Sequence, residues 1–347
     1  MSFLNKILLI LNLLWGLLLA LAFIGPTVDP SISAIPSILG ALFPILLIGH
    51  IFFILYWMLN RWQWSLISIL LLLAGWKHIY SFVGHNPVSK SPADIRVASF
   101  NLFGLREHNL GDANKKQKIE GELKQVLKTS PDVLCLQENN SYSSKVLEKV
   151  GLGKLTHNYT KGGVKLLTKF PIQDQGSFDL QSSINSCLWA EIRIHNSPVR
   201  VYCMHLRSNR VSTKAEDLVN EGVLSEKEAW TGVRTILGRY KEGAIKRKSQ
   251  ANKIKAHADN CTYPVVMMGD INDHPLSYAF GILSEKMKDS FYERGRGIGT
   301  TYGGSIPLLR IDYILASEQV NVLNHDILKT TASDHYFVSS DVSFNGK

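Results

Sequence analysis

The first 84 residues of this 347-residue chain almost lack acidic side chains, since Asp29 is the only Asp or Glu among them. Lysine and arginine are also rare there (Lys6, Arg61 and Lys77). The surface of a soluble domain normally carries many charges of both signs, so this composition excludes an ordinary water-exposed domain. The same region contains three long apolar runs, whereas the rest of the chain has the composition of a soluble protein. The sequence therefore indicates a membrane part followed by a soluble part.

Cysteine is also scarce, and its pattern lacks the common motifs. The chain has no CxxC pair and no Cys/His spacing typical of zinc; its four cysteines are Cys135, Cys187, Cys203 and Cys261. Cys135 and Cys203 lie in apolar, strand-like runs, VLCLQE and VYCMHL, where a cysteine usually acts as a small hydrophobic residue. The pattern predicts no disulfide framework, and it leaves the redox compartment undetermined. Internal repeats and low-complexity tracts are lacking as well, which argues against a repeat architecture.

Three transmembrane helices are predicted, at about residues 3–25, 32–59 and 64–83. Each run approaches or exceeds the ~20 residues that a helix needs to cross a hydrocarbon core of about 30 Å. A signal peptide is an alternative for the first run, but the run lacks a small-residue cleavage site and two more runs follow. Pro44 predicts a kink in the second helix, and His50 is expected to face a neighbouring helix without a functional role.

The few charges between the spans give the expected orientation. Lys6 precedes most of the first span and Arg61 lies between the second and third, whereas the loop PTVDPS after the first span has neither Lys nor Arg. The positive-inside rule then places the N-terminus in the cytoplasm, and an odd number of spans brings the soluble part to the extracytoplasmic side. Lys77 and the basic start of the soluble part argue against this orientation.

Residues 85–94 are expected to form a polar linker, and residues 95–347 a single domain. Strands are predicted at Ile95–Asn101, Val133–Gln137, Cys187–Ile194, Val199–His205, Tyr263–Met268, Ile311–Leu315 and Phe337–Phe344. Helical periodicity appears at Lys115–Lys128 and at about Lys227–Asp259. Strands and helices alternate, so the fold class is α/β or α+β with a large sheet core.

Several predicted strands end in a polar group of similar chemistry. In chain order these groups are Asn101, Glu138, His205, Asp270 with Asn272, Asp312, and Asp334 with His335. A single Asp or Asn after a strand is usually a turn residue. Six such ends in one domain are instead typical of a site on the loops at one edge of a sheet.

These residue types suit hydrolysis of a phosphate ester. A hard cation such as Mg²⁺ takes carboxylate and amide oxygens, with Glu138 as the expected anchor and Asn101 and Asp334 as neighbours. An Asp312–His335 pair would hold the imidazole in one tautomer. His205 could donate a hydrogen bond to a phosphate oxygen.

Asp270 could accept the proton of an attacking water, and Asn272 could orient that water or the phosphate. Asp273 and His274, which follow in VVMMGDINDHP, are interpreted as turn residues before Pro275.

The ordered series FNL, QE, HL, GDIND, IDYI and SDH resembles the endonuclease/exonuclease/phosphatase superfamily. This superfamily includes DNase I-like nucleases, abasic-site endonucleases, inositol-polyphosphate phosphatases and neutral sphingomyelinases. The resemblance covers residues 95 to 345 and none of the membrane part. It implies a four-layer α/β/β/α sandwich, a divalent metal (Mg²⁺ or Mn²⁺) at Glu138 assisted by Asn101 and Asp334, and an Asp312–His335 pair beside the phosphorus. It also implies Asp270 and Asn272 at the attacking water, and Thr301 as a weaker phosphate contact.

Two departures from the family's abasic-site nucleases concern the substrate. Phe103 stands where those enzymes have an acidic residue, and His205 stands where they have a tyrosine. A histidine there is commoner in the sphingomyelinase-like and phosphatase-like branches. Both departures weaken the interpretation as a DNA-repair enzyme.

A basic segment lies between Arg234 and Lys255, with eight Lys or Arg and one acid, Glu242. It is either a solvated helix face or an electrostatic guide for an anionic substrate or membrane surface. Arg247 lies on the apolar stripe of this helix and is expected to be structural. Arg207 and Arg210, just after His205, are better candidates for phosphate contact.

The sequence predicts a membrane-anchored, metal-dependent phosphodiesterase or phosphatase acting on lipid headgroups or phosphorylated metabolites. A membrane-anchored nuclease is the alternative, and the net charge of +9 fits either kind of anionic partner. A catalytically inactive family member used for binding is disfavoured, because the set of motif residues is complete.

Overall fold

The computed structural model describes residues 1–347 except 88, 109–112, 181–184, 209–225, 305–307 and 345–347. The chain divides into two compact units. The first, called the apolar-helix unit here, consists of Met1–Phe82, the described part of Asn209–Lys248, and Asp273–Ile282. The second, called the sandwich unit, consists of the described parts of Val83–Ser208, Ser249–Asn272 and Leu283–Lys347.

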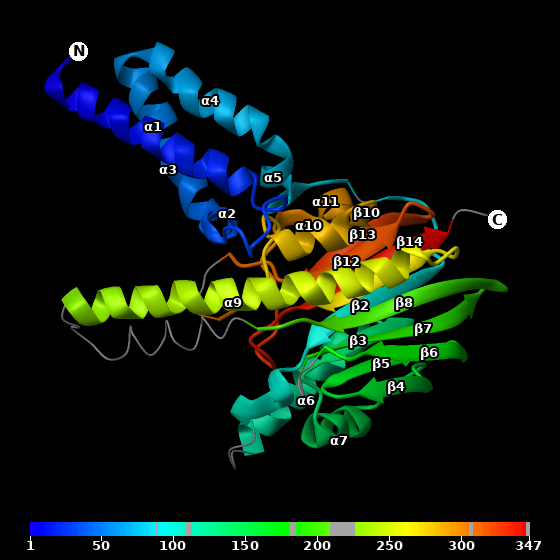
Figure 1. Cartoon of the computed structure of the whole chain (residues 1–347). Helices are drawn as coiled ribbons and strands as arrows, with labels where there is room; N and C mark the ends of the chain where they lie inside the picture. The colour runs from blue at the N-terminus through cyan, green and yellow to red at the C-terminus, as the bar shows by residue number, and fades with distance from the viewer. Residues whose placement is uncertain (88, 109–112, 181–184, 209–225, 305–307, 345–347) are drawn as a thin grey trace. The chain divides into compact units, whose positions relative to one another are not determined.

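The sandwich unit contains two six-stranded sheets packed face to face (Figure 1). The first sheet has the order β13 (Val320–Leu328), β14 (Phe337–Phe344), β2 (Ile95–Asn101), β3 (Val133–Gln137), β5 (Val164–Thr168) and β4 (His157–Lys161). The second has the order β10 (Met287–Asp289), β12 (Asp312–Ser317), β9 (Val265–Asp270), β8 (Ser197–His205), β7 (Ser186–Ile194) and β6 (Ile172–Phe178). A separate two-stranded ladder pairs β1 (Val83–His85) with β11 (Arg296–Ile298).

Helices cover the outer faces of both sheets. Ile119 and Leu123 of α6 (Ala113–Lys128) and Leu147 of α7 (Ser141–Val150) share a core with β2 and β3. On the second sheet, the Tyr202 hydroxyl of β8 lies 2.7 Å from Nδ1 of His257, near the end of α9 (Glu226–Asp259). A second core of mostly β-branched residues lies between the sheets. The predicted α/β/β/α layering is therefore present.

The predicted strands are all found, but several others are not evident from the sequence. The missed strands include β4 and β6, whose side chains are largely exposed or half-buried and therefore lack clear apolar alternation. The short β10 and β11 have three residues each. The shorter elements α10 (Tyr278–Ser284), α11 (Ser290–Arg294) and η2 (Phe103–His108) complete the two units.

The apolar-helix unit contains two helices that are long and apolar enough to cross a membrane, α1 (Phe3–Phe23) and α3 (Phe43–Asn60). The second predicted span is divided, because a break at Leu42 separates α2 (Ile35–Ala41) from α3, and Pro44 lies in the first turn of α3. The third is not one continuous helix either. It consists of η1 (Trp62–Trp64), α4 (Ser65–Ala74) and α5 (Trp76–Tyr80). It breaks at Gly75, where a Cβ would lie 1.9 Å from the Phe23 ring.

The third segment runs back along the first two helices. The ring of Phe82 lies 4.7 Å from that of Phe43 at the start of α3, although Phe82 follows the far end of α3 by 22 residues of chain. The His78 ring stacks on Phe23 at 5.0 Å, near the end of α1. His50 is buried and its Nδ1 lies 2.8 Å from the Ser68 hydroxyl, as expected for a histidine that faces a neighbouring helix.

Asp273 and His274 lie in a bend and a turn before Pro275, as expected, and the His274 carbonyl accepts the backbone N–H of Ser277 at 2.9 Å. Both are buried, and Asp273 accepts hydrogen bonds from the Tyr240 hydroxyl at 2.9 Å and from Nε of Arg247 at 2.9 Å. His274 Nε2 lies 3.1 Å from the same hydroxyl. Burial of the whole Arg247 side chain confirms that it is structural, because its guanidinium is neutralised by Asp273.

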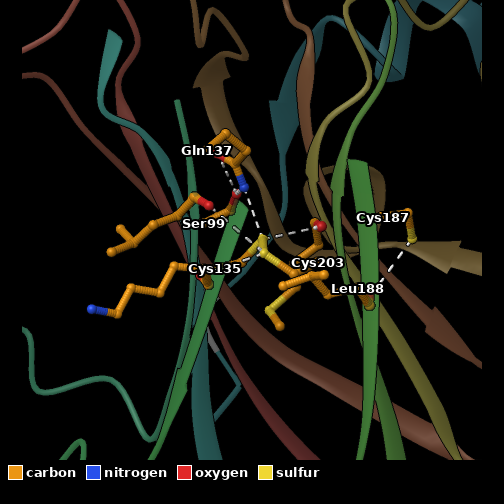
Figure 2. The surroundings of a disulfide bond; sticks show 9 residues. Ser99, Cys135, Gln137, Cys187, Leu188 and Cys203 are labelled. Carbon is orange, nitrogen blue, oxygen red and sulfur yellow. Dashed lines mark hydrogen bonds between the residues drawn. A yellow bond between two sulfur atoms is a disulfide. The ribbon is translucent and has the colours of Figure 1, made fainter. Parts of the chain in front are cut away.

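The structure also corrects the expectation that the cysteines form no disulfide. Cys135 of β3 is bonded to Cys203 of β8, so the bond joins the two sheets through the core (Figure 2). The Gln137 amide donates to Cys135 Sγ at 2.8 Å and to the Ser99 hydroxyl at 3.1 Å. Apolar strand positions suit a free cysteine and a core disulfide equally, so the local pattern could not separate them. Cys187 and Cys261 are free.

We expect loss of this disulfide to destabilise the sandwich unit. The bond closes a loop with a sequence separation of 68, which the chain-entropy model values at about 4 kcal/mol. The double variant Cys135→Ala/Cys203→Ala should therefore unfold at a lower temperature than the native chain, by scanning calorimetry. Cys261→Ser is the matched control and should leave the unfolding temperature unchanged. The chain without substitutions is then denatured and its thiols are titrated. The titration should find two thiols before reduction and four after it. Four thiols before reduction would contradict the disulfide.

Candidate functional site

Strand register places three of the predicted residues next to one another. In the second sheet, His205 of β8 is paired with Asp270 of β9, and Asp270 is paired in turn with Asp312 of β12. In the first sheet, Asn101 ends β2 beside Gln137, which precedes Glu138. His335 lies just before β14 and forms an isolated bridge with Tyr302. The predicted polar ends therefore meet at one edge of the sandwich.

Asp270 is at the centre of this group and is 1% exposed. Its Oδ2 accepts hydrogen bonds from the side-chain amides of Asn101 and Asn272, both at 3.0 Å. Its Oδ1 accepts from the backbone N–H of Asn272 at 2.7 Å. Gly269 is required just before it, since φ is 143° there and a Cβ would lie 2.0 Å from the carbonyl oxygen of Met204.

His335 connects the two buried aspartates. Its Nδ1 lies 3.0 Å from Oδ2 of Asp312, and its Nε2 lies 3.8 Å from Oδ2 of Asp270. Asp312 is held in turn by Thr301, whose hydroxyl accepts the backbone N–H groups of Ile311 at 3.0 Å and Asp312 at 3.1 Å. One ligand-type atom from each of Asp270, Asp312 and His335 lies within 4.8 Å of the others.

The charges in this cluster shift one another's pKa values. Burial raises the pKa of Asp270 to about 7; the His335 charge opposes this shift and the Asp312 charge adds to it. Burial by itself would lower the pKa of His335, but the Asp312 and Asp270 carboxylates outweigh it and raise this pKa to about 10. At neutral pH the imidazole is therefore a cation beside the Asp312 carboxylate, and Asp270 holds its proton to a higher pH than an exposed aspartate does.

Glu138 and Asp334 lie at the more open part of the site, with side chains 22% and 21% exposed. Glu138 Oε1 lies 3.8 Å from Nε2 of His205, which lies 3.8 Å from Asp270 as well. Glu138 has a φ of 47°, a strained backbone for a residue with a side chain, and Asn272 has a φ of 55°. Burial, aided by the negative charge of Glu138, raises the pKa of Asp334.

Glu138 and Asp334 have the ligand type that a divalent cation takes. The charge of Glu138 acts on Asp334, and the Asn101 side-chain oxygen, which accepts the backbone N–H of Phe103 at 2.9 Å, retains a second lone pair. Hard cations such as Mg²⁺ prefer this combination of partly accessible oxygen ligands. The more deeply buried group of Asp270, Asp312 and His335 offers a nitrogen ligand instead, and His335 already contacts Asp312.

Arg207, Arg210 and Thr301 are the three predicted phosphate contacts. Arg207 is half-buried, and its backbone N–H donates to the Gln250 side chain at 2.9 Å. Arg210 lies outside the described residues. Thr301 is fully buried, so its observed contacts are those that hold the start of β12. Phosphate contact by these three residues stays a prediction.

Three positioning contacts are not foreseen by the sequence. The Ser333 hydroxyl donates to the carbonyl oxygen of Asn101 at 2.7 Å and accepts the N–H of His335 at 3.1 Å. Tyr302 meets the His335 ring edge-on at 5.2 Å. Arg310, two residues before Asp312, is buried in an ion pair with Asp289. In the sequence, only the position of Ser333 at the start of the SDH tripeptide could have indicated its role.

Two packed sheets with polar side chains at one edge form the part of the chain that a family model also matches. The family model described as "Endonuclease/Exonuclease/phosphatase family" matches residues 98–335, more than half of the chain, and the protein belongs to this family. A second model, for a domain of unknown function (DUF8431), matches residues 5–82. No curated protein matches the sequence.

Solved structures share the fold of the sandwich unit. An endonuclease/exonuclease/phosphatase from Bacteroides vulgatus is 19% identical, with a TM-score of 0.55 over 72% of this chain and 99% of that one. A humanized D. rerio TDP2 is 15% identical, with a TM-score of 0.51 over 72% and 98%. A mannosyl-6-phosphatase from Bacteroides thetaiotaomicron VPI-5482 is 16% identical, with a TM-score of 0.51 over 72% and 100%. At these identities the likeness shows the fold alone.

We expect the stability of the metal-free protein to fall as the pH rises. Asp270 and His335 bind their protons more tightly in the folded chain, with pKa values raised from 3.8 to about 7 and from 6.5 to about 10. A raised pKa contributes stability that is complete below the unfolded value and is lost as the pH rises through the folded value. The Asp270 contribution should therefore disappear between pH 3.8 and about 7, and the His335 contribution between pH 6.5 and about 10. Thermal unfolding of EDTA-treated protein measures both.

Two histidine variants separate the contributions. His335→Gln should remove the alkaline loss of stability, whereas His325→Gln should retain it. Burial lowers the pKa of His325 to about 3, so its contribution is complete above pH 6.5 and is lost on acidification instead. An unfolding temperature of the native chain that stays constant from neutral to alkaline pH would contradict the charged state of His335.

Proposed function

We propose that the protein is a membrane-anchored, divalent-metal-dependent phosphoester hydrolase. The observation that carries this proposal is the buried Asp270, held by Asn101 and Asn272 and faced by the His335–Asp312 pair. Family membership supports phosphoester hydrolysis as the reaction class.

In the proposed reaction, Asp270 takes the proton of the attacking water. A general base works best when its pKa lies near the working pH, and burial raises the pKa of Asp270 to about 7. The amide of Asn272 orients the water or a phosphate oxygen. His335, kept cationic by Asp312, and His205 donate toward the phosphate oxygens, where negative charge develops.

Glu138, Asn101 and Asp334 would hold the divalent cation, Mg²⁺ or Mn²⁺. When bound, this cation would neutralise the charge of the substrate phosphate. Burial and, to a smaller extent, the charge of Glu138 raise the pKa of Asp334, and the same cation would favour its charged form.

The proposed substrates are lipid headgroups or phosphorylated metabolites. The apolar-helix unit supports the first class, because anchoring would hold the site at a high local concentration of headgroups. The net charge of +9 also supports the alternative, a nuclease. A comparison of phospholipid vesicles, a generic phosphodiester and plasmid DNA as substrates separates them. DNA cleavage without lipid turnover would overturn the preferred substrate class while leaving the reaction class intact.

We expect Asp270→Asn to abolish most hydrolysis without unfolding the protein. Removing a general base costs about 10²–10⁴-fold in rate. The amide oxygen can still accept a hydrogen bond, but the amide nitrogen cannot replace the other carboxylate oxygen as an acceptor, so we expect a lower unfolding temperature with the fold retained. The measurement is the hydrolysis rate with Mg²⁺, paired with thermal unfolding.

A second variant tests the metal site separately. Glu138→Gln should weaken Mn²⁺ binding, measured by calorimetry, as well as hydrolysis. Asp326→Asn is the matched control, since this carboxylate is 46% exposed and forms a surface ion pair with Arg296. Full activity of Asp270→Asn would refute the assignment of the base, and unchanged Mn²⁺ affinity of Glu138→Gln would refute that of the metal ligand.

We also propose three membrane crossings, with the sandwich unit on the extracytoplasmic side. Within the apolar-helix unit, Asp29 in the loop after α1 forms an ion pair with Lys248, and Leu276 packs with Leu19 and Phe43. The loop after α1 is thereby on the same side as residues 248 and 276. With α1 and α3 as the first two crossings, the segment Trp62–Tyr80 must supply a third. As a helix, its 19 residues would span about 28 Å.

The side of the membrane follows from two further observations. The Cys135–Cys203 disulfide is typical of proteins in oxidising compartments. The loop after α1 carries no Lys or Arg, whereas Arg61 lies in the loop after α3. Both support an extracytoplasmic sandwich unit.

Cysteine labelling tests this topology. In a Cys261→Ser background, Ile32→Cys and Lys253→Cys should react with an impermeant maleimide in sealed, right-side-out membrane vesicles. Asn60→Cys, at the exposed end of α3, should react only after the vesicles are opened. Reaction of positions 32 and 253 from opposite sides would exclude three crossings. Reaction of both only after opening would reverse the orientation.

A further inference from the structure

Helix α9 carries a continuous stripe in which large apolar residues alternate with cations. The stripe consists of Trp230, Arg234, Leu237, Lys241, Ile245 and Lys248, spaced by 4, 3, 4, 4 and 3 residues. This spacing keeps all six on one side of a helix. Trp230 is 68% exposed, Leu237 41% and Ile245 36%. Exposed tryptophan and leucine at regular helical spacing indicate a surface that meets an apolar partner.

A neighbouring side of the same helix is fixed by burial. Tyr240 and Ala244 are buried, and Arg247 is bound to Asp273. The buried side anchors α9 within the apolar-helix unit, so the direction in which the stripe points is fixed as well.

One end of the stripe is at the end of a membrane-length helix. Lys248 forms an ion pair with Asp29, six residues after the last residue of α1. The chain at Asp29 has just left the apolar helix α1, so Lys248 lies at the level of the membrane boundary under the anchoring proposed above. From there to Trp230 the stripe extends for about 27 Å along the helix.

We propose that this stripe lies on the surface of an anionic phospholipid bilayer. Trp230, Leu237 and Ile245 would insert between the headgroups, and Arg234 and Lys241 would contact lipid phosphates. The inference rests on the membrane anchoring in the proposed function, and it is independent of the hydrolytic reaction. It gives the basic helix a role in holding the protein against the bilayer surface.

The composition of the stripe favours a lipid surface over nucleic acid. Half of its residues are large and apolar, and Trp230 is its only aromatic residue, whereas single-stranded nucleic acid is bound by a series of stacked aromatics. Between Trp230 and Lys248 the only acid is Glu242, which lies off the stripe and pairs with Lys246 at 2.6 Å. Tryptophan beside lysine and arginine is the usual composition of a membrane interface.

A fluorescent label on the stripe tests this proposal. In a Cys261→Ser background, Leu237→Cys is labelled with a nitrobenzoxadiazole group, and the full chain is reconstituted in vesicles that contain acyl-chain spin-labelled lipid. Arg239→Cys is the matched control, because position 239 is exposed at the same level of the helix but lies away from the stripe. One set of vesicles is phosphatidylcholine alone, and the other also contains phosphatidylglycerol.

We expect the label at 237 to be quenched several-fold more than the label at 239 in the anionic vesicles. The difference should shrink in phosphatidylcholine alone, in high salt, and in the Arg234→Gln/Lys241→Gln variant. Equal quenching at 237 and 239 in anionic vesicles would overturn the proposal. A label at 237 that responds to added duplex DNA but not to spin-labelled lipid would assign the stripe to nucleic acid.

A flotation experiment separates failure of the lipid contact from failure of the proposed membrane anchoring. If the protein does not float with the vesicles in a density gradient, the anchoring is refuted and the lipid contact with it. If it floats without selective quenching at 237, only the lipid contact is refuted. Hydrolysis is not measured in either case, so a different substrate or reaction leaves this test unaffected.

Discussion

The burial of two carboxylates opposite each other, on neighbouring strands, is the constraint on which the site depends. Asp270 and Asp312 are paired in register on β9 and β12, and each is 1% exposed. Burying one uncompensated charge costs several kcal/mol, and the His335 cation between the two carboxyl groups offsets this cost. His335 comes from the loop before β14 in the other sheet, and Ser333 fixes this loop against Asn101. Charge compensation therefore requires that both sheets be assembled.

The disulfide joins the two strands that lead to Glu138 and His205. Cys135 lies three residues before Glu138, and Cys203 lies two residues before His205. The bond thus fixes β3 to β8 close to where these strands deliver an anionic and an imidazole side chain. Glu138 and His205 approach to 3.8 Å from different sheets, so small shifts between the sheets would alter their geometry directly.

The sequence predicts the strand ends well, because each combines an apolar run with a polar residue where the run stops. It does not predict register, which depends on contacts between strands that are distant in the chain, such as His205 with Asp270. The disulfide is missed for the same reason, since Cys135 and Cys203 each fit an apolar strand. The turn at Asp273 and His274 is predicted, but their burial is not, because their partners, Tyr240 and Arg247, lie on a helix distant in the sequence.

Asp273 directly follows the residues of the site but has a buried partner of its own. The chain passes from Asn272, which binds Asp270, directly to Asp273, which is buried in an ion pair with Arg247 of α9. Two residues beyond His274, Leu276 packs among Leu19 and Phe43 of the apolar helices. Asn272 lies directly before Asp273 and has a φ of 55°, in the left-handed region of the backbone. Its backbone N–H and its side-chain amide both donate to the Asp270 carboxylate. The residue that ends this loop of the sandwich unit therefore fixes both oxygens of the buried carboxylate.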